Sequence, residues 1–218
     1  VLKEAMKAAP DAGEFKTMLD SIQSVRDAKA ELFTRLYQIK GLASFSEKMP
    51  AYRIFLDDLE SAVAKYGRQK MADPLETAKA QLKNEVREQK TQGRKLPEEF
   101  VQLTVQHFPE LEDFISDAQY EILIKKAEQA KSVAEKADAY IAALALNPNR
   151  PEASEAIRAL ILGAEENGER EHAISMLERA VAAAPSNGLI VELEEEIGRH
   201  VEIYPTAGGC DEKNRITE

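Results

Sequence analysis

The stretch that decides the fold occurs twice, as LERAVAAAPSNG at residues 177–188 and as LKEAMKAAPDAG at residues 2–13. The leucine, three of the alanines, the proline and the final glycine occupy the same places in both copies. A looser copy, YIAALALNP, covers residues 140–148. Alanine favours helices, whereas proline and glycine favour helix ends, so each copy predicts the end of a helix. Self-similarity of this kind is typical of helical repeat proteins.

The rest of the chain also predicts helices, and no segment alternates as a strand would. Apolar residues recur at steps of three and four along one long segment that ends before Gly41. They are Phe15, Met18, Leu19, Ile22, Val25, Leu32, Phe33 and Leu36. This stripe predicts one helix of about 25 residues. Two further helices are expected to begin after Pro50 and at Asp73-Pro74, where Asp73 would cap free amides.

Proline residues also mark helix boundaries in the remaining segments. Pro97 is expected to open a helix that Pro109 interrupts. Four helices of similar length are then predicted over residues 117–129, 134–146, 154–166 and 169–184, and a fifth over residues 189–200.

Residues 117–187 resemble tetratricopeptide repeats, which are antiparallel helix pairs that stack side by side. Asn167-Gly168 matches the turn within a pair, and Pro185 matches the end of a unit. Ala173 and Ala180 match the small residues at the helix crossing. Ile161 and Gly163 depart from the family pattern. The resemblance implies an all-α fold of antiparallel helix pairs in a right-handed superhelix, with an additional N-terminal helical region.

The repeated stretches and this resemblance together predict that the chain has four parts. Residues 1–12 are interpreted as the end of a repeat helix whose beginning would precede Val1. Residues 13–115 form a helical region that is either a set of degenerate repeats or a separate insert. Residues 116–201 form two tetratricopeptide-like helix pairs and a capping helix, and residues 202–218 form a polar tail.

The resemblance further implies that the leading helix of each pair lines a concave groove. The outward residues of these two helices are Glu121, Lys125, Glu128, Gln129, Glu155, Arg158, Leu162, Glu165 and Glu166. This predicted lining is mainly acidic, which favours a basic or amphipathic peptide or helix as the partner.

No catalytic, metal or cofactor motif stands out. The three histidines are far apart, and Cys210 has no second cysteine with which to form a disulfide or a CxxC motif. Glu169 and His172 have the Glu-x-x-His spacing of di-iron bundles, but such sites need two copies. We interpret them as an exposed first turn of a helix. The chain is therefore not expected to be an enzyme or to hold a metal or cofactor.

The net charge of −10 argues against non-specific nucleic-acid binding. No apolar run approaches the ~20 residues of a membrane span, and a cytoplasmic location is expected. The first functional hypothesis is a non-catalytic scaffold that binds a partner protein or peptide. An architectural module that forms a homo-oligomer is an alternative. A third is a regulatory region of a larger signalling protein or enzyme whose effector domain lies upstream of Val1.

Overall fold

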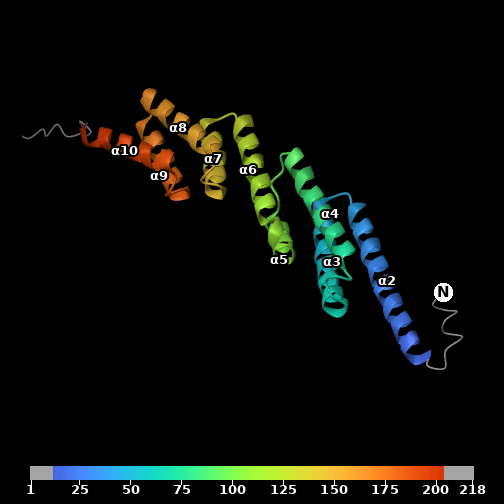
Figure 1. The fold of residues 1–218 in the computed structure, drawn as a ribbon. Coiled ribbons are helices and arrows are strands. Elements are labelled where there is room, and N and C mark those ends of the chain that lie inside the picture. Colours follow the sequence, from blue (N-terminus) through green and yellow to red (C-terminus); the bar gives the residue numbers. More distant parts are fainter. Residues whose placement is uncertain (1–11, 204–218) are drawn as a thin grey trace, which may run out of the picture. The chain divides into compact units, whose positions relative to one another are not determined.

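The computed structural model describes the backbone of residues 12–203 and the side chains of residues 13–197. Every element in this part of the chain is helical, which confirms the all-α prediction (Figure 1). The elements are α2 (Ala12–Lys40), α3 (Phe45–Tyr66), α4 (Ala72–Thr91), α5 (Glu98–His107), the 3₁₀ turn η1 (Pro109–Leu111), α6 (Glu112–Gln129), α7 (Val133–Leu146), α8 (Pro151–Glu166), α9 (Arg170–Ala183) and α10 (Gly188–Ile203).

The expected repeat end at residues 1–12 and the polar tail at residues 202–218 fall almost wholly outside the described residues. Between residues 12 and 203, no helix combines the length and the apolar character needed to cross a bilayer.

The chain divides into two compact units, which are described separately. Residues up to Gln92 and Leu96–Ile115 form unit 1, whereas Gly93–Lys95 and the residues from Ser116 onward form unit 2.

In unit 1, only part of the apolar stripe of α2 is buried. Its C-terminal half packs on α3 and α4, where Leu32, Leu36 and Ile39 are buried. Phe15, Met18 and Ile22 on its N-terminal half are exposed. A continuous stripe therefore has a covered end and an uncovered end among the described residues.

The start of α3 differs from the prediction. Ser44 accepts a hydrogen bond from the Glu47 amide, and the Glu47 carboxylate accepts one from the Ser44 amide. This reciprocal cap starts the helix at Phe45. Pro50 therefore lies inside α3 and does not precede it.

The expected cap of α4 is also wrong. The helix begins at Ala72 after Met71, and no side chain caps it. Asp73 instead accepts a hydrogen bond from Lys29 of α2, at 2.8 Å. Asp73 thus lies within the first turn of α4 and pairs with a cation of another helix.

Aromatic residues fill the core of unit 1. The ring of Phe100 on α5 meets Phe45 and Tyr52 of α3 edge to face, with centroids 5.0 and 6.2 Å away. Pro109 ends α5 as predicted, and the chain continues through η1 into α6.

In unit 2, α7, α8, α9 and α10 pack on one another around a single apolar cluster. Gly168 has φ +77°, a left-handed conformation that glycine accepts readily, and it forms the predicted tight turn between α8 and α9. Ala173 and Ala180 on α9 are fully buried, and Leu177 is 6% exposed. Small residues at these positions allow α8 and α9 to approach closely.

Candidate functional site

The leading candidate site is an open hollow of about 410 Å³ between α6 and α7 of unit 2. Its floor and walls are mostly apolar, and α6, α7 and the segment before α5 supply the lining. The lining residues are Lys95, Gln119, Ile122, Leu123, Lys126, Asp138, Ala139, Ala142 and Leu146. A cavity of this size and composition is within the range of ligand and peptide sites.

Helix periodicity places these residues on facing sides of the two helices. On α7, Ala139, Ala142 and Leu146 follow one another at steps of three and four, so they share one face. Ser132 and Glu135 form a reciprocal cap that fixes where α7 begins. Leu146 remains 39% exposed, which leaves an apolar side chain at the mouth of the hollow.

The rim of the hollow is basic. Lys95 and Lys126 are exposed and lie on it. The acidic rim residue, Asp138, already accepts a hydrogen bond from Arg179 of α9. An incoming acidic side chain would therefore meet two lysines, with the nearby carboxylate already paired.

Tyr120 connects α6 to the start of α8. Its hydroxyl accepts a hydrogen bond from the Ala153 amide (3.2 Å) and donates one to Glu152 (3.3 Å). The Arg150 guanidinium lies over the ring, 4.6 Å from its centroid. The pKa of Tyr120 is raised above its ordinary value, and burial of the side chain is the main cause. These contacts hold α6 against the α8 end of the unit and thereby fix one wall of the hollow.

None of the nine residues predicted to line a groove lines this hollow. On α6, Lys125, Glu128 and Gln129 are exposed and Glu121 is half-buried. Lys125 and Lys126 are neighbours, so they point in different directions around the helix. Only Lys126 contributes to the hollow.

The five predicted residues on α8 have varied surroundings. Glu155 and Glu166 are exposed. The Arg158 guanidinium lies 3.9 Å from the Glu196 carboxylate of α10, and Leu162 packs against the apolar cluster. Glu165 is half-buried, and its Oε1 is enclosed with no hydrogen-bond partner in the described part of the chain. This face of α8 is thus partly engaged with the rest of unit 2.

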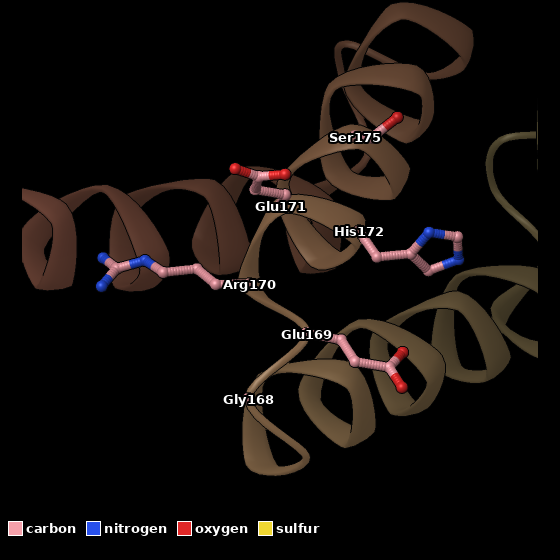
Figure 2. A pocket seen from close by; sticks show the side chains of 6 residues that line it. All are labelled: Gly168, Glu169, Arg170, Glu171, His172 and Ser175. Atoms are coloured by element: carbon pink, nitrogen blue, oxygen red, sulfur yellow. The ribbon is translucent and has the colours of Figure 1, made fainter. Parts of the chain in front are cut away.

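A second hollow, of about 580 Å³, lies at the start of α9 (Figure 2). Figure 2 shows that its side chains diverge: Arg170 points to one side, whereas Glu169 and His172 point to the other. Glu169 and His172 are exposed, as expected for a first turn. The charged side chains around this hollow therefore do not all converge on one point.

Within residues 13–197, no group of three or more His, Cys, Asp or Glu side chains is placed to hold a metal ion. Cys210 lies outside the described residues.

The hollow could not be found by assigning groove positions from a family resemblance. The signal for the hollow in the sequence is a second apolar face of α7. This face includes Leu146, which does not belong to the core cluster of unit 2. An alanine-rich helix is apolar on several faces, so its sequence does not reveal which face stays open.

Comparison with protein-family models, curated proteins and solved structures found no match to this chain.

Proposed function

We propose that this chain is a non-catalytic protein-interaction scaffold of tetratricopeptide-like helix pairs, and that it binds a partner segment in the hollow between α6 and α7. The observation that carries the proposal is an apolar lining left open between two helices of unit 2. Exposed apolar surface rimmed by polar residues is typical of protein interaction sites.

The lining fits a peptide side chain better than a polar metabolite. Ile122, Leu123 and Ala139 offer contacts to an apolar group but no donors that converge on one point. Amphipathic helices bind such surfaces through apolar residues at i, i+3, i+4 and i+7.

The charged residues at the rim of the hollow favour a partner of one charge. Lys95 and Lys126 favour acidic residues that flank the apolar anchors. The partner class is therefore an amphipathic helix with acidic flanks. The mainly acidic groove face expected on α6 and α8 would instead favour a basic segment, so the charge preference of the protein distinguishes the two faces.

A defined peptide tests the proposal. The probe is a synthetic amphipathic helical peptide with leucines at i, i+3, i+4 and i+7 and glutamates beside them, and a matched peptide carries lysines instead. Titration calorimetry is expected to show tighter binding of the glutamate peptide. Ala142→Glu should weaken it about tenfold or more, because a carboxylate in the hollow loses hydration and repels the peptide. Ala145→Glu, on an exposed position of the same helix outside the lining, is the control.

The two neighbouring lysines separate the candidate faces. Lys126→Glu should weaken binding of the glutamate peptide, whereas Lys125→Glu should leave it nearly unchanged. The reverse result would assign binding to the α6–α8 face and contradict the hollow. A lack of binding to both peptides would also contradict the proposal.

A further inference from the structure

One part of unit 1 is basic although the whole chain is acidic. Residues 65–92 contain seven lysines and arginines and four aspartates and glutamates, whereas the net charge of the chain is −10. Two of the four carboxylates are already paired with lysines from other helices. Asp73 binds Lys29 of α2, and Glu85 binds Lys48 of α3. Within this stretch, only two carboxylates therefore remain for seven cations.

Three of these cations share one side of α4. Lys79, Lys83 and Arg87 follow one another at steps of four, so their side chains lie on the same side of the helix. Leu82 and Val86, each one position earlier than a cation, are buried in unit 1. One position turns a helix by about 100°, so the basic side lies beside the buried side of α4.

The three cations differ in their partners. Lys79 Nζ lies 2.9 Å from a carboxylate oxygen of Glu76 and 2.9 Å from one of Glu110, so its charge is neutralised. Lys83 and Arg87 form no ion pair with a carboxylate of residues 13–197. Their two positive charges remain available to an anion from another molecule.

An aromatic ring positions both of these cations. Lys83 Nζ lies 5.5 Å and the Arg87 guanidinium 5.6 Å from the centroid of Phe114, which is half-buried at the start of α6 and belongs to unit 1. Arg87 also donates a hydrogen bond to Asn84 Oδ1, at 3.0 Å. Cations are attracted to the face of a ring, and this contact restrains two long side chains. Less conformational entropy is then lost when an anion binds them.

We propose that Lys83 and Arg87, positioned by Phe114, bind an acidic helical segment of a partner protein. Glutamates at i and i+4 of a helix are separated by about 6 Å along its axis, which is the same rise as that from Lys83 to Arg87. Two carboxylates of one helix can therefore meet the two cations together. This surface lies in unit 1, whereas the hollow of the proposed function lies in unit 2, so the inference goes beyond that function.

A single-stranded nucleic acid fits this surface less well. Proteins that bind such strands combine a basic groove with aromatic rings on which bases stack. The Phe114 ring already contacts two cations. The net charge of −10 also repels a long polyanion more strongly than a short acidic peptide.

A peptide without apolar anchors tests the proposal on the full chain. The probe is a fluorescein-labelled, alanine-based helical peptide with glutamates at i, i+4 and i+8, and a matched peptide has glutamines at the same positions. Fluorescence anisotropy is expected to show binding of the glutamate peptide that weakens as sodium chloride is added, because salt screens exposed charges. The glutamine peptide should not bind.

Matched variants locate the binding surface. Lys83→Gln/Arg87→Gln should weaken binding about fivefold or more, since two exposed ion pairs are lost. Arg26→Gln/Lys40→Gln removes the same charge from exposed positions of α2 and should have little effect. Phe114→Leu should weaken binding at unchanged net charge, whereas Phe114→Tyr keeps the ring and should bind like the original chain. Circular dichroism checks that each variant is folded.

Four outcomes would overturn the proposal. They are no binding of the glutamate peptide, equal effects of the two double variants, binding that is lost with Lys126→Glu but kept with Lys83→Gln/Arg87→Gln, and tighter binding of a single-stranded oligonucleotide of equal charge through the same two residues. The third would assign the peptide to the rim of the hollow. Ala142→Glu should leave binding of this peptide unchanged, so the inference and the proposed function can fail separately.

Discussion

Lys48 Nζ on α3 lies 2.9 Å from Oε1 of Glu85 on α4, and this carboxylate is only 2% exposed. The Tyr52 hydroxyl and the Gln81 amide each donate a hydrogen bond to the same oxygen, at 3.1 Å. A buried carboxylate is costly unless cations and donors compensate its lost hydration. The four side chains thus form one polar network between α3 and α4.

Removal of one member of this ion pair should destabilise unit 1. Lys48→Met leaves Glu85 buried without its cation, and we expect a loss of about 3 kcal/mol in the free energy of unfolding. Urea titration followed by circular dichroism measures it. The double variant Lys48→Met/Glu85→Leu should recover most of the loss, because it removes the buried charge as well.

The exposed pair between Arg53 and Glu99 provides the comparison. Its side chains are 58% and 57% exposed, so Arg53→Met should cost less than about 1 kcal/mol. Equal effects of Lys48→Met and Arg53→Met would contradict the compensating role of Lys48.

The network should also give unit 1 an alkaline sensitivity. Burial raises the pKa of Tyr52 above its ordinary value of about 10, and the charge of Glu85 raises it further. The folded chain therefore keeps this proton at pH values where the unfolded chain loses it. Stability from Tyr52 is fully present below pH 10 and falls above it, by up to about 1.4 kcal/mol per pH unit.

Tyr52→Phe tests this sign. At pH 8 the variant should be less stable than the original chain by about 2 kcal/mol, because a hydrogen bond to a charged group is lost. Above pH 10 the difference should shrink. Tyr37→Phe, at a side chain 79% exposed, controls for removal of a phenol. A difference that stays constant from pH 8 to pH 11 would argue against the prediction.

The Tyr120 hydroxyl caps a helix to which it does not belong. Ala153 lies in the first turn of α8, where amides lack partners within the helix. The side chain of the N-cap residue Arg150 does not cap this helix. Tyr120→Phe leaves this buried amide unpaired and should cost about 1–2 kcal/mol in unfolding free energy. Tyr140→Phe on α7 is the matched change. Thermal melts in which both variants behave alike would rule out the capping role.

The crossing of α8 and α9 depends on a small residue. Ala180 is fully buried, so Ala180→Leu should overpack the crossing and lower stability by about 1–3 kcal/mol. Ala182→Leu on the exposed side of the same helix should be close to neutral. Differential scanning calorimetry compares the two. A neutral Ala180→Leu would show that the helices can separate at this point at little cost.

Much of the helical content was predictable from local patterns. Gly41, Gly67 and Gly168 each follow a helix end, and the latter two have positive φ values that favour glycine. Pro109 interrupts a helix because its ring removes a donor. These signals act within a few residues of chain, so the sequence carries them directly.

The start of α3 was misplaced because a local signal, the cap formed by Ser44 and Glu47, was missed, whereas the errors at α4 arose where distant residues competed with local ones. Asp73 had the sequence context of a cap but pairs with Lys29, 44 positions away. A glutamate in a helix is ordinarily exposed, yet Glu85 is buried. Neither partner could be identified without the packing of α2, α3 and α4.

By itself, the sequence determined that the chain is helical, where most helices begin and end, and which stretch is repeated. Those features follow from helical periodicity, proline and glycine, which act locally. Only the tertiary structure decided which apolar faces are covered and which stay open. Ile190 near the start of α10 and Phe15 near the start of α2 are both apolar, yet one is buried and the other 39% exposed. Burial depends on the neighbours that packing brings against a helix, and a helix's own sequence does not specify them.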